Sequence, residues 1–215
     1  MLITFLVILT LTVLYWFPVR RWFRRWGTTD EDRSRVMAGD PVIANPTHSA
    51  THALTIDAPP EDIWPWLVQM GYRRGGLYSY DWLDRLFGYL DRPSANRVLP
   101  EFQQLSVGDV IPIGRGQGFP VTAIEAYRTL VLSGTNEGFQ WVWQFGLYPL
   151  DEGRTRLVSR GTQRFANTIG TWLFMRVMEP AAFIMTRRML LGLKQRAEAV
   201  RAARTGDGRA NRQAA

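Results

Sequence analysis

Two tyrosines, an aspartate and a tryptophan lie together just after a pair of glycines, and these residue types can bind a ligand or move a proton. They are Tyr78, Tyr80, Asp81 and Trp82. A buried Asp81 would have a pKa raised by desolvation and could act as a general base, with the hydroxyl groups facing the mouth of a pocket. The alternative is structural, since a carboxylate in the first turn of a helix interacts favourably with the helix dipole. Ser79 is a common helix-capping residue, so the sequence favours the structural role.

A strand predicted over residues 140–148 carries bulky aromatic residues at every second position. Trp141, Trp143 and Phe145 would share one of its faces, because successive side chains of a strand point to opposite sides. With that face inside, the rings would line an apolar cavity suited to a hydrophobic ligand. Alternatively, the rings fill the interior, because voids in a packed core are costly. The sequence leaves both alternatives open.

The chain has two histidines and no cysteine, which limits its metal and nucleophile chemistry. Without cysteine, thiolate zinc sites, iron–sulfur clusters and cysteine nucleophiles are excluded. His48 and His52 would share a strand face about 13 Å apart, which is too far for one metal ion. The acidic residues show no metal-ligand spacing. We therefore expect no metal and no cofactor, and His52 is instead a candidate to line a ligand cavity.

The hydrophobic pattern predicts an α+β domain over residues 50–203 that would position these side chains. A strand at residues 50–57 alternates polar and apolar positions. A helix is expected at 63–70 and a second, short one at 79–87. A long helix over 181–203, with apolar residues at helical spacing, ends the domain. Between the helices we expect short strands at residues 109–113, 119–126, 129–133, 140–148 and 154–164.

Three arginines, Arg156, Arg160 and Arg164, share one face of the last predicted strand. We expect this face to be the solvated, convex side of the sheet. A buried arginine among them would instead indicate a carboxylate or an anionic headgroup on the ligand.

An uncharged apolar run, Leu2–Phe17, opens the chain and is followed closely by four arginines. Its large apolar side chains favour bilayer insertion by roughly 3 to 7 kcal/mol, and its length is near the lower limit for a span. A secretory signal peptide would instead carry basic residues before the apolar run and small residues after it. Here the arginines follow the run among bulky aromatic residues, so a membrane anchor is favoured. The positive-inside rule then places the remaining chain in the cytoplasm, as a single-pass protein.

The net charge of +7 is concentrated at the two ends of the chain. Residues 18–35 contribute +3 and residues 187–215 contribute +6, whereas residues 36–186 carry −2. A nucleic-acid-binding domain needs positive charge on its folded body, so this class of function is excluded. Basic residues beside an apolar helix instead suit anionic lipid headgroups. The expected segments around the domain are an anchor with its basic flank at 1–26, a linker at 27–49 and a disordered basic tail at 204–215.

Four stretches of the sequence resemble the SRPBCC superfamily, the START-like group of polyketide cyclases, dehydrases and lipid-transport proteins. They are THALTIDAPPEDIWPWLVQMGYRRGGLYSYDWLD from Thr51, LSVGDVI from Leu105, GRTRLVSR from Gly153 and FIMTRRMLLGLKQRAE from Phe183. The resemblance covers about residues 50–203. It implies a helix-grip fold, in which a curved antiparallel sheet wraps a long C-terminal helix and leaves a deep, mainly apolar cavity. It also implies a hydrophobic ligand and, in a minority of members, cyclisation or dehydration chemistry.

The sequence thus predicts a membrane-anchored module that takes a hydrophobic or amphipathic molecule of lipid, isoprenoid or polyketide type into an internal cavity. Membrane lipid would be contacted by residues 2–17 and the arginines that follow them. The expected ligand-binding residues are Tyr78, Tyr80, Asp81, Trp82, Trp141, Trp143, Phe145 and His52. The alternative is an enzyme of cyclase or dehydratase type, which would draw its acid and base groups in the same cavity from Tyr78, Tyr80, Asp81, Glu101 and His52. The sequence does not decide whether any reaction is catalysed.

Overall fold

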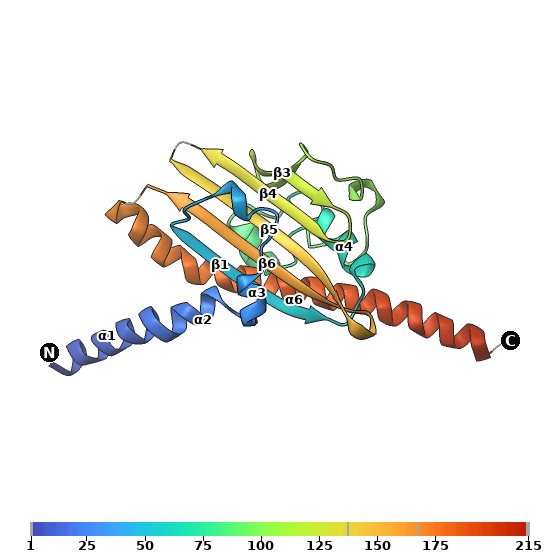
Figure 1. Ribbon diagram of the computed structural model, residues 1–215, viewed down its shortest axis with the longest axis horizontal. Helices are drawn as coiled ribbons and strands as arrows, with labels where there is room; N and C mark the ends of the chain where they lie inside the picture. The colour runs from blue at the N-terminus through green and yellow to red at the C-terminus, as the bar shows by residue number, and fades with distance from the viewer. Residues whose placement is uncertain (1, 137, 167, 214–215) are drawn as a thin grey trace.

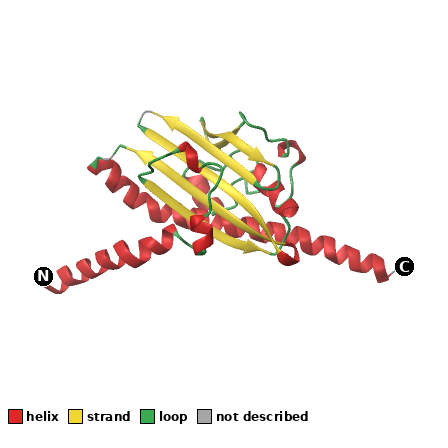
Figure 2. Cartoon of the chain, in the orientation of Figure 1, coloured by secondary structure: helices red, strands yellow, loops and turns green. Residues whose placement is uncertain are grey.

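The computed structural model describes residues 2–136, 138–166 and 168–213 and shows an α+β fold (Figure 1). A six-stranded antiparallel sheet curves around the long C-terminal helix α6 (Ile169–Gln213), and an N-terminal helix projects away from this body. Figure 2 shows the sheet and the helices as separate layers. The predicted fold class, a helix-grip sheet around a C-terminal helix with an apolar helix at the N-terminus, is confirmed.

The sheet has the strand order β1-β6-β5-β4-β3-β2, and every neighbouring pair is antiparallel. All six predicted strands are present. The longest ladder joins β5 to β6 across a turn at Asp151–Gly153 (η4), the hairpin expected from the sequence. The strands are β1 (His48–Ile56), β2 (Val110–Gly114), β3 (Gln117–Glu125), β4 (Thr129–Asn136), β5 (Phe139–Leu150) and β6 (Arg154–Phe165).

The two short predicted helices are present as α4 (Pro60–Val68) and α5 (Asp81–Leu86). Pro60 suits the first turn of α4, because its missing N–H would be unbonded there in any case. The first helix of the chain and five further short elements precede or connect these parts of the fold. They are α1 (Leu2–Leu14), η1 (Tyr15–Val19), α2 (Arg20–Arg24), α3 (Asp30–Ser34), η2 (Asp40–Val42) and η3 (Pro100–Phe102).

Helix α6 begins at Ile169, well before the start that the sequence predicts at residue 181. The predicted start was wrong, because the helix continues through Pro180 toward its N-terminus. Proline cannot donate a backbone hydrogen bond, which usually breaks a helix. Here the carbonyl of Arg176, four residues earlier, accepts a hydrogen bond of 2.9 Å from the Tyr15 hydroxyl. At its other end α6 runs on through residues 204–213, the segment expected to be a tail.

The core lies between the concave face of the sheet and α6. Phe145 of β5 is fully buried, and it belongs to one continuous apolar cluster with Leu157 of β6 and with Leu190 and Leu193 of α6. The aromatic face of β5 therefore points inward, and Phe145 helps to fill the interior. Trp141 and Trp143 lie at the edge of this cluster and are partly buried.

Residues 27–45, which we name the strap, lie across the opposite, convex face of the sheet. Met37 of the strap packs against Ala53 and Val158, and Ile43 packs against Val131 and its neighbours. Both side chains are only 4% exposed. Most of the segment expected as a linker is thus bound along the sheet, and its few apolar residues fasten it there.

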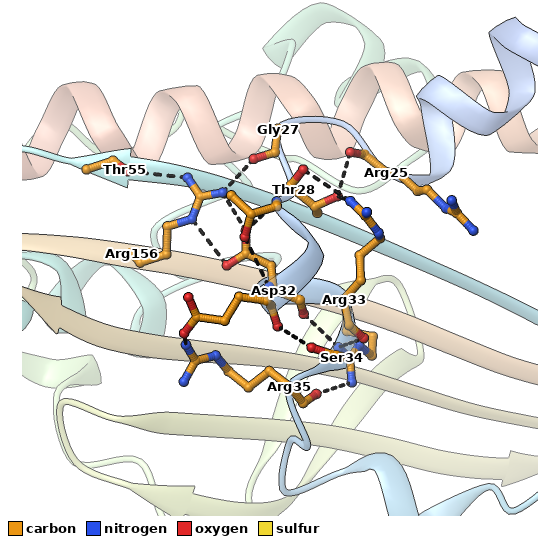
Figure 3. A network of polar contacts seen from close by, with 12 residues as sticks. Arg25, Gly27, Thr28, Asp32, Arg33, Ser34, Arg35, Thr55 and Arg156 are labelled. Atoms are coloured by element: carbon orange, nitrogen blue, oxygen red, sulfur yellow. Dashed lines mark hydrogen bonds and ion pairs between the residues drawn. The ribbon is translucent and has the colours of Figure 1, made fainter.

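Polar contacts also hold the strap to the sheet (Figure 3). Arg156 donates to the carboxylate of Asp32 at 2.6 Å, and Arg160 donates to the carboxylate of Asp40 at 2.6 Å. Arg160 also donates to the carbonyl oxygen of Arg35 at 3.0 Å. The expectation that Arg156 and Arg160 are solvated was wrong, because the strap covers them. Their anionic partners belong to the protein itself, so their burial gives no evidence of an anionic ligand on this face.

The N-terminal helix is the one helix in the described part of the chain that is long and apolar enough to cross a membrane. This stretch, Ile3–Arg24, is not buried within the protein. Length and composition alone would also fit a signal sequence. Its far end is attached to the folded body, since Arg20 donates to Glu179 of α6 at 2.7 Å and Arg24 donates to the Ser49 carbonyl at 2.6 Å.

Candidate functional site

The loop between α4 and α5 folds back on itself at two glycines. Gly71 and Gly76 exchange backbone hydrogen bonds of 3.0 and 3.1 Å. Gly76 has a φ of +81°, and a Cβ there would lie 2.6 Å from the Ser94 hydroxyl oxygen, so glycine is needed. The loop then meets α6 at Gly192, where a Cβ would lie 2.4 Å from the carbonyl oxygen of Tyr78. The close approaches at Gly76 and Gly192 thus allow Tyr78 to pack directly against α6.

A cleft of about 460 Å³, which we name the tyrosine cleft, opens where this loop, α5 and α6 meet. It brings together four residues that are close neighbours in the sequence, two tyrosines, an aspartate and a tryptophan. Five further residues complete its wall, and three of them are arginines. The lining consists of Tyr78, Ser79, Tyr80, Asp81, Trp82, Arg85, Ser94, Arg188 and Arg196.

Aromatic rings supply the apolar part of the cleft. Trp82 is 66% exposed, Tyr80 is half-buried and Tyr78 is buried. Tyr78 packs edge-on against Trp66 with the ring centroids 6.0 Å apart. Burial raises the pKa of the Tyr78 hydroxyl above its ordinary value, so this phenol stays protonated and is a poor acid. The three rings thus form a surface whose exposure increases from the floor of the cleft to its mouth.

The two aspartates next to the cleft have structural partners. Asp81 accepts hydrogen bonds from the backbone N–H of Ser94 at 3.0 Å and from its hydroxyl at 2.7 Å. Asp84 is fully buried, and the Ser79 hydroxyl, whose oxygen lies 3.0 and 2.9 Å from the two carboxylate oxygens, donates its one proton to this carboxylate. Burial, with a further contribution from Asp81, raises the pKa of Asp84 to about 6. Asp81 lies in the first turn of α5, as the structural alternative expects, and it fastens Ser94 to this helix. The expected Ser79 cap is wrong, because the N-cap residue is Tyr80 and no side chain caps the helix there.

Guanidinium groups supply the charge of the cleft. Arg196 stacks over the Tyr78 ring at 4.6 Å and donates to the carbonyl oxygen of Ala95 at 2.8 Å. Burial lowers the pKa of Arg196, but an arginine remains charged at neutral pH. Arg188 lies over the Tyr80 ring at 5.7 Å. Within the described residues, neither Arg85 nor Arg188 has a carboxylate partner. With one aspartate among three arginines, the cleft carries an excess of positive charge.

The aromatic residues predicted on β5 do not line the tyrosine cleft. Trp141 packs against Phe119 of β3 with the ring centroids 4.2 Å apart, and Trp143 donates from its indole N–H to the Ser159 hydroxyl at 3.1 Å. Phe145 is enclosed in the core. These three residues are therefore absent from the lining of the cleft, and their part in ligand binding stays a prediction.

His52 lies on the side of the protein where the N-terminal helix ends. Its Nε2–H donates to the carbonyl oxygen of Phe23 at 2.8 Å, and its ring packs against Phe183 at 5.7 Å. Burial lowers its pKa, so the ring is neutral at pH 7. The contacts are those of a structural histidine that fixes the chain after α2. Within the described ranges, no three or more His, Asp or Glu side chains gather as a metal site.

The arginines of the cleft were missed in the sequence, although a signal for them exists. Arg188 and Arg196 are eight positions apart on a predicted helix, which places them about 80° apart around its axis, close enough to line one side together. The predicted helix rests on the spacing of its apolar residues alone. Arg85 and Ser94 could not be placed, because the loops that bring them to α6 have no repeating pattern.

Comparisons with known proteins give fold likeness only. No family model and no curated protein matches the chain. Among solved structures, protein MLL2253 of Mesorhizobium loti is 18% identical, with a TM-score of 0.40 over 71% of this chain and 98% of that one. CalU16 of Micromonospora echinospora is 16% identical (TM-score 0.34; 72% and 86% covered), and CV1439 of Chromobacterium violaceum is 12% identical (TM-score 0.42; 70% and 96% covered). Likenesses at this level carry no inference about ligand or activity.

Proposed function

We propose that this protein is a membrane-anchored helix-grip module that binds an amphipathic molecule, of lipid or polyketide type with an acidic group, in the tyrosine cleft. The observation that carries the proposal is the pairing of exposed aromatic rings with guanidinium groups that have no carboxylate partner among the described residues. The rings of Tyr80 and Trp82 would take the apolar part of the ligand. Arg188 would take its anionic group, because guanidinium groups form charge-assisted bidentate hydrogen bonds with carboxylates and phosphates.

The energy of binding would come mainly from apolar burial, at about 25 cal/mol per Å² of surface removed from water, offset by the cost of immobilising the ligand. The N-terminal helix supports a role for the membrane in this proposal. A tether to the bilayer raises the local concentration of a lipid-like ligand without adding any contact. The arginines after the helix favour a cytoplasmic position for the domain.

The tyrosine cleft supports binding better than the enclosed cavity expected from the sequence. The space between the sheet and α6 holds the continuous apolar cluster to which Phe145 belongs. A closely packed interior of this kind leaves less room for a ligand than an open cleft at its edge. The proposal therefore places the ligand beside α6 rather than beneath the sheet.

The geometry also favours binding over acid–base catalysis. Asp81 is occupied by Ser94, and His52 lies away from the cleft. The raised pKa of Tyr78 makes it a poor proton donor. Glu101, the remaining acid considered, is exposed on η3 and does not line the cleft.

A ligand with and without its charge tests the proposal. The full chain in a neutral detergent would be titrated with dodecanoate and with dodecanol, both at low concentration, while thermal melting and intrinsic tryptophan fluorescence are followed. We expect dodecanoate to raise the melting temperature and to bind about tenfold more weakly to Arg188→Gln, because one charge-assisted contact is lost.

Arg115→Gln is the matched control, because Arg115 is exposed on the β2–β3 turn and does not line the cleft. It removes the same charge and should leave binding unchanged. A wild-type melting temperature that ignores both amphiphiles, or equal losses in the two variants, would count against the proposal.

A further inference from the structure

A second hollow, of about 290 Å³, lies beside the end of the N-terminal helix, away from the tyrosine cleft. We name it the arginine pocket, because five of its seven lining residues are arginines. They come from α2, from the turn after it and from the strap, while β1 forms the remaining wall. The lining consists of Arg20, Arg21, Arg24, Arg25, Arg33, Ser49 and Thr51.

Hydrogen bonds fix the frame of this pocket. Arg24 donates two hydrogen bonds, at 2.9 and 2.6 Å, to the carbonyl oxygen of Ser49 on β1. Arg33 of the strap donates to the hydroxyl oxygen of Thr28 at 3.1 Å. Thr51 is buried and accepts a hydrogen bond from Arg160 at 3.1 Å. Segments distant in the sequence are thus held together before any ligand arrives.

The charges in the pocket are far from balanced. Arg20 pairs with Glu179 at 2.7 Å, and Arg33 pairs with the exposed carboxylate of Asp30. Five guanidinium groups therefore meet two carboxylates, which leaves an excess of three positive charges. Arg21 and Arg25 are exposed and have no carboxylate partner in the part of the chain that the structure describes.

The neighbouring His48 lies close enough to the arginines of the pocket for their positive charges to lower its pKa. His48 is mostly buried, with its Nδ1 3.8 Å from Glu179 Oε1. Burial first, and then the charges of Arg24, Arg20 and Arg176, lower the pKa of His48 to about 4. The nearby carboxylate does not offset these arginines, so the pocket still lacks negative charge.

The position of the pocket suits a membrane surface. Counted along a helix at 1.5 Å per residue, Arg20 and Arg24 lie about 4 and 10 Å beyond Phe17, the last residue of the apolar run. The headgroup region of a bilayer is of the same depth, roughly 5 to 8 Å on each side of the hydrocarbon core. With the N-terminal helix inserted, the pocket would open among lipid headgroups.

We propose that the arginine pocket is a binding site for a terminal phosphate group. A phosphomonoester carries a charge of about −1.5 to −2 and three acceptor oxygens, which matches several guanidinium groups better than a carboxylate does. Arg21 and Arg25 would close on the phosphate, while Arg20 and Arg24 hold the floor. The group could be borne by a lipid such as phosphatidic acid or by a soluble molecule, because the same oxygens are presented in both cases. This site is independent of the tyrosine cleft.

The test uses the full chain and distinguishes the two sources. In one arm, protein in neutral maltoside detergent is titrated with glycerol 3-phosphate, and its melting temperature is followed. In the other arm, protein in phosphatidylcholine nanodiscs is compared with protein in discs that also contain phosphatidic acid or, at equal mole fraction, phosphatidylserine. Native mass spectrometry counts the retained lipids.

The test variant is Arg21→Gln with Arg25→Gln, which should leave the fold intact because both side chains are exposed and without carboxylate partners among the described residues. The control, Arg115→Gln with Arg128→Gln, removes the same charge from exposed positions at the far edge of the sheet. We expect the test variant to weaken phosphate binding about tenfold or more, and the control to weaken it less than about twofold.

Each outcome decides the proposal. Selective retention of phosphatidic acid over phosphatidylserine, lost in the test variant, supports a lipid-borne phosphate. A shift with glycerol 3-phosphate, lost in the same variant, supports a soluble one. Equal retention of the two anionic lipids with no response to glycerol 3-phosphate, or equal losses in the test and control variants, overturns it. Because the soluble arm needs neither a bilayer nor the tyrosine cleft, its failure is separate from a failure of the proposed function.

Discussion

The hydroxyl of Tyr15 donates a hydrogen bond of 2.9 Å to the carbonyl oxygen of Arg176, the carbonyl whose helical donor Pro180 removes. One contact therefore does two things. It provides a backbone acceptor in α6 with a donor, and it joins the N-terminal helix to the folded body. Tyr15 lies at the start of the π-helical turn η1, which contains a proline of its own. The irregular turn of one helix thus meets the irregular turn of the other.

We expect Tyr15→Phe to destabilise the full chain in detergent by about 1 to 3 kcal/mol, because a partly buried carbonyl loses its donor. Pro180→Ala restores a backbone N–H at the position that bonds Arg176 within the helix. In that background Tyr15→Phe should cost much less. A double-mutant cycle measured by thermal melting gives the coupling between the two positions.

The control for this cycle is Tyr127→Phe, since Tyr127 is a half-exposed tyrosine whose ring contact with Trp64 the change retains. Additive effects of the Tyr15 and Pro180 substitutions would show that the hydroxyl does not serve this carbonyl.

Glu179 is the buried carboxylate around which the base of the N-terminal helix is organised. Its side chain is 5% exposed and lies within 4 Å of the guanidinium groups of Arg20, Arg24 and Arg176. Removing one partner of a buried ion pair leaves uncompensated charge, so we expect Glu179→Gln to lower stability by about 3 kcal/mol. Urea unfolding of the full chain in neutral detergent measures this.

Glu125→Gln provides the comparison, because Glu125 pairs with Arg128 at the surface and the change should cost no more than about 1 kcal/mol. If Glu179→Gln were as mild as the surface change, the carboxylate would not be what holds the arginines together.

Local patterns predict the sheet well and the strap badly. The alternation around Phe145 identifies a strand and its inward face, because the period of two is intrinsic to the backbone. The burial of Arg160 has no such signal, since its partner Asp40 lies 120 positions earlier and only tertiary packing joins them.

In the candidate site, too, local patterns predict some residues correctly and miss others. Tyr78, Tyr80, Asp81 and Trp82 are neighbours in sequence, so a local pattern places them at one cleft. The aromatic residues of β5 share a face but not that cleft, because curvature of the sheet and packing of α6 decide what each face meets. Pro180 inside α6 shows a further limit of local patterns. A proline usually ends a helix, but here the hydroxyl of the distant Tyr15 supplies the hydrogen bond that the proline cannot donate.

The strap should respond to acid through Asp32. Burial alone would raise the pKa of Asp32, but hydrogen bonds from Arg156 and Thr29 outweigh it, and the net pKa lies below the ordinary 3.8. A carboxyl whose pKa is lower when folded adds stability above its unfolded pKa and loses it as the pH falls through the folded value. We expect this contribution to decline progressively as the pH falls below about 4.

Asp32→Asn should therefore increase amide hydrogen exchange in residues 27–45 at pH 7, and its difference from the wild type should shrink as the pH falls through the folded pKa of Asp32. Asp30→Asn is the control, because Asp30 is almost fully exposed on the same helix α3. Equal exchange in the Asp32 variant and wild type at pH 7 would mean that the apolar contacts of Met37 and Ile43 hold the strap alone.

Two buried groups, His48 and Asp84, should give opposite pH dependence over the same range. The pKa of His48 falls from 6.5 to about 4 on folding, so the unfolded chain binds more protons between these values and stability decreases as the pH falls. The pKa of Asp84 rises from 3.8 to about 6, so the folded chain binds more protons and stability increases as the pH falls. Each effect amounts to at most about 3 kcal/mol, and in the wild type they largely cancel.

Single variants separate these effects. In Asp84→Asn, His48 is the member of the pair that still titrates, so the free energy of unfolding should decrease more steeply than in the wild type as the pH is lowered from 6.5 to 4. In His48→Asn, Asp84 is the member that still titrates, and the free energy should shift upward relative to the wild type over the same range. The double variant, which lacks both groups, should follow a profile between those of the two single variants. Urea unfolding at half-unit pH steps measures all four profiles, and parallel curves for the two single variants would show that neither group is buried in the state that unfolds.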